Sequence, residues 1–234
     1  MPVDTGHVAG AGKMLNTQKK IAVGIALCFA AAAAGTSLAI LQSARQQVSV
    51  AAVPATTNRN AGNFHLGDAL PDFTLQDAEG KDATLASLRK PGKLTLVLTH
   101  SPDCPCAANC GKLITDLQKQ HGADVVIVGF MSADTTSNAA LERLGEQVKD
   151  GTVTFPVYYD HDQSVKRLLG ATRTPEAWLL DRDGRIAYYG APENTLFPNA
   201  KNHRRLLNEA ADAILQGKRP EIERFDPIGC LIGE

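Results

Sequence analysis

The chain has 234 residues, and its 24 Lys and Arg against 25 Asp and Glu give a formal net charge of -1 at pH 7. Its 44% hydrophobic and 21% charged residues are ordinary globular values, which exclude a wholly disordered chain, a collagen-like fibre and a coiled-coil rod. The near balance of acidic and basic residues also argues against nucleic acid as the main partner, since phosphate binding needs a basic surplus.

The N-terminal region predicts export from the cytoplasm. Residues 21–41 form an uninterrupted apolar run, which is long enough to cross a bilayer as a helix. Lys13, Lys19 and Lys20 precede the run, so we expect residues 1–20 to stay cytoplasmic. The run acts either as a transmembrane anchor or as a cleaved signal peptide, and its length slightly favours the anchor. The remainder is then membrane-anchored on the extracytoplasmic (periplasmic) side, or secreted after cleavage.

One folded domain is expected to follow. Residues 42–63 are polar and without periodicity, which is typical of a flexible linker, and residues 64–234 can form one domain with its own core. The predicted elements, in order, are a strand at 94–99, a helix from Pro105 to Gly122, a strand at 125–130, helices around Leu144 and Leu168, hairpin strands at 177–180 and 186–189, and a helix at 206–214. The strand–helix–strand crossover from 94–99 to 125–130 predicts that these two strands are parallel. The Asp183-Gly184 turn predicts that the strands at 177–180 and 186–189 are antiparallel. We therefore expect an α/β fold with a mixed central sheet and helices on both faces, preceded by an N-terminal hydrophobic helix.

Three of the five cysteines lie within seven residues, between the first strand and the first helix of this domain. Reactive groups favour that edge of a sheet, and a helix start stabilises a thiolate. Cys104, just before Pro105, is best placed for this, and we expect its sulfur to be accessible. The carboxylate of Asp103 opposes the effect. His100 could accept the thiol proton, although an ordinary strand-end histidine is the preferred interpretation.

The same cluster has a second interpretation. Cys106 and Cys110 are four residues apart, so on a helix they would share one face. With Cys104 or His100 nearby, they offer soft ligands for copper or zinc, or they could form a reversible disulfide. A copper- or zinc-binding chaperone is therefore the alternative to a thiol enzyme, which would need no cofactor.

Several segments in order resemble the thioredoxin-fold redoxins of the alkyl hydroperoxide reductase/thiol-specific antioxidant type. These segments are LGDALPDFTL at 66–75, the Cys104-Pro105 pair, TRTPEAWLLDRDGRIAYYG at 172–190 and the tail IGCLIGE at 228–234. The resemblance implies a thioredoxin-like three-layer fold over residues 64–234 and a reactive Cys104. It also implies a cis peptide bond at Pro175, which would face that cysteine. A free backbone edge at Thr174 would then pair with an extended substrate peptide.

Departures from the family patterns leave the reaction open. A thioredoxin-type pair would have a second Cys where Ala107 stands and a Trp where Asp103 stands. A typical peroxiredoxin would have Pro at the position of Val97, whereas Ser101 fits its pattern.

The expected function is an exported or membrane-tethered thiol-disulfide oxidoreductase or thiol-dependent peroxidase, in which the Cys104 thiolate attacks. Cys106, Cys110 or Cys230 would resolve the intermediate, and Cys230 could equally be a core-anchoring residue. The implied partners are a protein disulfide or peroxide substrate, a thiol reductant, and the membrane through residues 21–41. The remaining interpretation is a redoxin-like interaction module without catalytic activity, in which the cysteines form a structural disulfide.

Overall fold

A computed structural model describes residues 62, 64–132 and 137–233 of the chain, all within a compact unit spanning Thr56–Glu234. The predicted cytoplasmic segment, the apolar run at 21–41 and nearly all of the linker lie outside these residues. Among the helices of the described ranges, none combines the length and the apolar character that a bilayer crossing requires.

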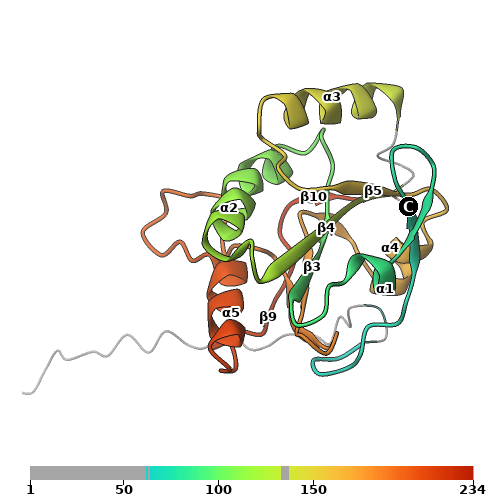
Figure 1. The fold of residues 1–234 in the computed structure, drawn as a ribbon. Helices are drawn as coiled ribbons and strands as arrows, with labels where there is room; N and C mark the ends of the chain where they lie inside the picture. The colour runs from blue at the N-terminus through green and yellow to red at the C-terminus, as the bar shows by residue number, and fades with distance from the viewer. Residues whose placement is uncertain (1–61, 63, 133–136, 234) are drawn as a thin grey trace, which may run out of the picture. The chain divides into compact units, whose positions relative to one another are not determined.

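One large sheet and one two-stranded sheet organise the domain (Figure 1). The strands are β1 (Thr74–Gln76), β2 (Asp82–Thr84), β3 (Leu94–Thr99), β4 (Val125–Ser132), β5 (Val157–Asp160), β6 (Arg173–Thr174), β7 (Ala177–Leu180), β8 (Ile186–Gly190), β9 (Arg224–Phe225) and β10 (Cys230–Leu231). The large sheet has the order β2-β1-β5-β4-β3-β7-β8-β9, and the small sheet pairs β10 with β6. Strand β3 is central, parallel to β4 and antiparallel to β7, so the sheet is mixed as expected.

Helices cover both faces of the large sheet. They are α1 (Leu85–Leu88), α2 (Pro105–His121), α3 (Asn138–Lys149), α4 (Ser164–Leu169) and α5 (Leu206–Leu215). Leu94, Leu96 and Leu98 of β3 point into one apolar cluster with α2, α3 and α5. Val97 points to the opposite cluster, with α1 and α4. This alternation follows from the two-residue period of a strand, and it gives β3 its continuously buried sequence.

The predicted class, an α/β thioredoxin-like fold with a mixed central sheet, is confirmed in the described residues. The strands at 94–99 and 177–180 begin and end as predicted, whereas the strand at 125–130 extends to Ser132. Strand β5 was missed because its sequence, VYYD, is half-buried and lacks a long apolar run. Strand β10, which contains Cys230, was missed because it has only two residues.

Candidate active site

Cys104 begins helix α2. It is the N-cap residue, with an extended backbone (φ -94°, ψ 113°), and Pro105 follows in the first turn. The Cys104 carbonyl accepts hydrogen bonds from the N–H groups of Ala107 and Ala108, at 3.0 and 3.1 Å. Proline fits this first turn because its missing N–H would have had no helical partner. The predicted position of Cys104, between the end of β3 and the positive end of a helix, is thus confirmed.

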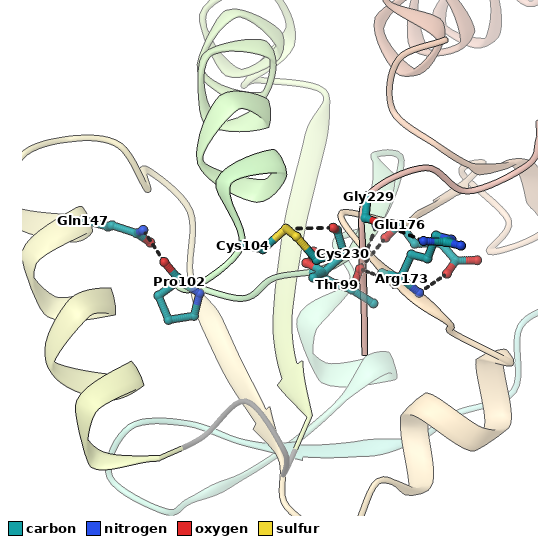
Figure 2. Close-up of a disulfide and its surroundings, with 9 residues drawn as sticks. Thr99, Pro102, Cys104, Gln147, Arg173, Glu176, Gly229 and Cys230 are labelled. Atoms are coloured by element: carbon teal, nitrogen blue, oxygen red, sulfur yellow. Dashed lines mark hydrogen bonds between the residues drawn. A yellow bond between two sulfur atoms is a disulfide. The ribbon is translucent and has the colours of Figure 1, made fainter. Parts of the chain in front are cut away.

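Cys104 forms a disulfide with Cys230, which lies 126 residues further along the chain (Figure 2). The two Cα atoms are 6.0 Å apart, as is usual for this bond. Cys104 is only 2% exposed, while Cys230 is half-buried. The expectation of an accessible sulfur at position 104 is therefore wrong for the disulfide form, because the C-terminal segment covers it.

Strand β10 places Cys230 by pairing with β6. The pairing is antiparallel, with Cys230 opposite Thr174 and Leu231 opposite Arg173. The Arg173 guanidinium donates to the Gly229 carbonyl at 2.8 Å, and the Ile232 N–H donates to the Thr172 carbonyl at 3.0 Å. The backbone edge at Thr174 was expected to be free. It is occupied by the protein's own tail, in the manner of an added strand.

The Thr174–Pro175 peptide bond is cis, as the family resemblance implies. The Thr174 carbonyl oxygen lies 3.1 Å from the Cys104 Sγ. A disulfide sulfur carries no proton, so this distance marks a contact in the oxidised form. In the reduced form the thiol of Cys104 can donate a hydrogen bond to this carbonyl. The loop before Pro175 therefore contacts the sulfur directly.

Thr99, the last residue of β3, holds this loop in place. Its hydroxyl donates to the Arg173 carbonyl at 2.9 Å and accepts from the Glu176 N–H at 2.7 Å. Its own N–H donates to the Glu176 carbonyl at 2.9 Å. Because Thr99 is buried, these bonds form in a medium that strengthens them. This role could not be predicted from the sequence, since a threonine at a strand end is common.

Glu176 is a buried carboxylate directly after the cis-proline. It is 5% exposed, and its Oε2 accepts from the N–H groups of Thr172 and Arg173, at 2.9 and 3.2 Å. Burial raises the pKa of Glu176 to about 7, although these hydrogen bonds and the charge of Arg173 act in the opposite direction. The sequence analysis missed this residue. The available signal was a glutamate directly before the apolar strand β7.

We expect Glu176→Gln to change the pH dependence of stability. Between pH 4.5 and 7 the folded protein holds a proton on Glu176 that the unfolded chain has released, so the free energy of unfolding falls as pH rises. The loss should reach about 3 kcal/mol by neutral pH. The variant, which cannot ionise here, should lose this slope in urea titrations across that range.

Two comparisons make this test specific. His100, whose pKa is lowered to about 4, has the opposite slope between pH 4 and 6.5, so only the difference from the wild type isolates Glu176. Glu79→Gln alters an exposed carboxylate and should reproduce the wild-type curve. Parallel curves for the wild type and Glu176→Gln would contradict the assignment.

Gly229 lets the tail approach the cis-proline loop. Its φ is +143°, a region that favours glycine. A β-carbon added there would collide with the Thr174 carbonyl oxygen and lie 3.3 Å from Pro175 Cδ. The Gly-Cys pair of the tail therefore has a steric cause: the residue before Cys230 has to be glycine for β10 to pair with β6.

Gly229→Ala should weaken this pairing and slow formation of the Cys104–Cys230 disulfide. The strained φ and the collision together should cost about 1–3 kcal/mol in the oxidised protein. Mass spectrometry after alkylation at intervals during reoxidation measures the rate of disulfide formation. Gly217→Ala is the matched control, because Gly217 has φ +72° but open space around it. Equal rates in both variants would show that close approach at Gly229 is unimportant.

His100 and Asp103 contact helix α3. The His100 ring lies 3.2 Å from the Gln147 Oε1 and edge-on to Phe155. Burial lowers the pKa of His100 to about 4, so the ring is neutral at pH 7. Gln147 also donates to the Pro102 carbonyl at 3.1 Å (Figure 2). Asp103 pairs with Arg143, which partly compensates its charge. These contacts favour a structural role for His100, as the sequence interpretation preferred.

Cys106 and Cys110 line the same small recess but differ in exposure. Cys110 is 3% exposed in the apolar cluster beneath α2, and burial raises the pKa of its thiol. Cys106 is half-buried and lines a small recess with Asn109, Pro175 and Ile228. Among the described residues, Cys106, Cys110 and His100 do not form the metal-binding group that the spacing suggested.

A different group of sulfurs comes together instead. The sulfurs of Cys104, Cys106 and Cys230 all lie within 4.8 Å of one another, and we call them the sulfur triad. Reduced thiolates of this kind suit copper(I) or zinc. The Cys104–Cys230 disulfide uses two of them, however, and this pairing favours redox chemistry over metal handling.

Comparison with known proteins gives the family. The Redoxin family matches residues 65–203. A hypothetical protein of Sinorhizobium meliloti 1021 with a known crystal structure is 32% identical, with a TM-score of 0.63 over 72% of this chain and 94% of that one. The chain belongs to the Redoxin family, whose members are thioredoxin-fold thiol oxidoreductases.

Curated relatives include a thiol-disulfide oxidoreductase and a peroxiredoxin. Thiol-disulfide oxidoreductase ResA of Geobacillus thermodenitrificans is 27% identical over 125 residues, which cover 52% of this chain and 66% of that protein. A putative chloroplastic peroxiredoxin Q of Oryza sativa is 26% identical over 152 residues, which cover 59% of this chain and 65% of that protein. The alignments thus span less than two thirds of these relatives' own length.

Proposed function

We propose that this protein is a thiol-disulfide oxidoreductase whose redox couple is Cys104 and Cys230, and that its substrates are polypeptide disulfides. One observation carries the proposal: the site already holds a polypeptide cysteine. Cys230 is bonded to Cys104 while its backbone pairs with β6 beside the cis-proline. A foreign peptide cysteine bound in the same way would form the same kind of disulfide. Hydrogen peroxide needs no such backbone edge.

The reaction has two exchange steps. In the reduced protein the Cys104 thiolate attacks one sulfur of a substrate disulfide, forming a mixed disulfide and releasing the other substrate sulfur as a thiolate. The Cys230 thiolate then attacks the Cys104 sulfur. The bond between Cys104 and the substrate breaks, its electron pair leaves on the substrate sulfur, and the Cys104–Cys230 disulfide remains. An external dithiol must reduce this disulfide before the next cycle.

The N-terminal region supports a location outside the cytoplasm. The apolar run at 21–41 follows three lysines, and we propose that it exports the domain and tethers it to the membrane. A dithiol–disulfide couple persists in an oxidising compartment. Protease treatment of intact cells and of spheroplasts tests this location, because an extracytoplasmic domain is cleaved without membrane disruption.

Single-turnover oxidation tests the proposed reaction. The reduced full chain is mixed with a disulfide-bonded peptide or with hydrogen peroxide at equal concentration, quenched in acid, alkylated and mapped by mass spectrometry. The expected result is that the peptide produces the Cys104–Cys230 disulfide with the larger second-order rate constant. A larger rate constant for peroxide would overturn the proposal in favour of a peroxidase. No oxidation by either, or a disulfide that resists dithiol, would leave a silent module with a structural bond.

A further inference from the structure

We infer that Cys106 is a third redox-active thiol, which exchanges into the Cys104–Cys230 disulfide by displacing Cys230 from Cys104. This inference deepens the proposed function and rests on Cys104 being the reactive cysteine. Its basis is the sulfur triad, in which Cys106 lies within 4.8 Å of both sulfurs of the bond. Thiol–disulfide exchange requires only that a thiolate reaches one sulfur of a disulfide.

Exposure distinguishes Cys106 from the other free cysteine. Cys110 is buried in the apolar cluster beneath α2, where its thiolate is disfavoured. Cys106 is half-buried in the first turn of α2; both cysteines line the recess that also contains Pro175 and Ile228, but only the sulfur of Cys106 belongs to the sulfur triad. Ile228 leads directly into Gly229 and Cys230, so the recess opens beside the disulfide. Cys106 is thus the more exposed of the two free cysteines, and its sulfur lies beside the disulfide.

The exchange conserves electrons and needs no additional oxidant. Cys106 loses its proton to solvent, and its thiolate attacks the Cys104 sulfur. The Cys104–Cys106 bond forms, the Cys104–Cys230 bond breaks, and the electron pair leaves on the Cys230 sulfur, which takes a proton. The number of disulfides is unchanged. The consequence is mechanical: β10 loses its covalent link to α2 and is held to β6 only by backbone pairing and contacts of its neighbours.

Release of the tail would uncover the edge of β6, with which β10 pairs. Leu231 is 73% exposed, and Ile232, at 9%, is the tail residue that packs into a core cluster. So few apolar contacts hold a two-residue strand weakly once the disulfide is gone. After exchange the β6 edge at Thr174 can receive an extended substrate. Cys106 would thus connect the redox state of the site to its accessibility.

Disulfide mapping in the full chain tests this inference. Cys230→Ser is combined with Cys110→Ala, so that one partner near Cys104 remains on α2, and the reduced protein is treated with one equivalent of diamide. The expected product is an intramolecular Cys104–Cys106 disulfide, in which the peptide loses two hydrogens and neither cysteine is alkylated. Addition of Cys106→Ser is the matched control, and it should give only mixed disulfides or intermolecular dimers through Cys104. A Cys106 that stays alkylatable in the first variant, with intact circular dichroism, overturns the inference.

The wild type supplies a second measurement that does not depend on folding of a variant. Reduced protein is oxidised in a single turnover and quenched in acid at intervals. We expect the Cys104–Cys106 disulfide at early times, and its fraction should decline as Cys104–Cys230 accumulates. Only Cys104–Cys230 at every time point would contradict the exchange. Failure of this inference is distinct from failure of the proposed function. The proposed function fails if peroxide oxidises the reduced protein faster than the peptide does, or if turnover survives Cys104→Ser, and neither result depends on Cys106.

Discussion

Cys104→Ser should abolish catalytic turnover of disulfide peptides, with a fall in rate of at least roughly 10³-fold, the scale on which enzymes lose activity with their nucleophile. A serine hydroxyl stays protonated at neutral pH, whereas exchange requires a thiolate attacking sulfur. The substitution also removes the sulfur to which Cys230 bonds, so the Cys104–Cys230 disulfide cannot form. Steady-state reduction of a fluorescent disulfide peptide, with an external dithiol as the electron source, measures the loss.

The matched control is Cys110→Ala. Cys110 lies on the same helix in the core cluster and makes no disulfide. This variant should keep turnover within a few-fold of the wild type, because alanine fits the small buried site. Retained turnover in Cys104→Ser would remove Cys104 from the reaction, whereas equal losses in both variants would indicate that disruption of α2, and not loss of the nucleophile, is the cause.

Reduction of the Cys104–Cys230 disulfide should lower the free energy of unfolding by about 2–5 kcal/mol. The bond closes a loop of 126 residues, so breaking it allows the unfolded chain many more conformations. For a domain of this size each kcal/mol corresponds to about 2–4 °C in melting temperature. Urea titrations of the oxidised protein and of the protein kept reduced by an excess of dithiol measure the difference.

Cys230→Ala should bring the urea titrations of the oxidised and the reduced protein close together, because any Cys104–Cys106 bond that forms instead closes only a very short loop. Cys110→Ala should keep the wild-type difference. Coincident titrations for the wild type would show that native strain or residual structure in the unfolded chain offsets the entropy of the closed loop.

Long apolar segments made most of the fold predictable, and short polar ones concealed the site. Strand β3 reads LTLVLT, a short apolar run that indicates a strand buried on both faces, and Pro105 marks the start of α2. The position of Cys104 follows from those two elements. The pairing of β10 with β6 joins two strands of two residues each, which are too short to show a periodic pattern in the sequence. Cys230 could thus be named as a partner, but so could Cys106 and Cys110.

The remaining errors have one origin, which is that the spacing of residues along the chain does not determine the tertiary surroundings of a side chain. Cys106 and Cys110 are one turn apart, yet Cys110 is buried in the core and only Cys106 joins the sulfur triad. The sulfur triad includes a residue from the far end of the domain. Glu176 was overlooked because burial of a carboxylate depends on tertiary packing, which turns an ordinary glutamate into a group with a pKa of about 7.

The 126-residue interval between Cys104 and Cys230 also orders events during biosynthesis. A chain emerges from the ribosome, or from a translocation channel, with its earlier cysteines first. Cys104, Cys106 and Cys110 therefore meet any oxidant before Cys230 has been made. In an oxidising compartment the nascent chain passes through a stage in which Cys104 can pair only with a near neighbour or with a folding catalyst. For a chain exported as proposed above, maturation would then include exchange of Cys104 from an early partner to Cys230.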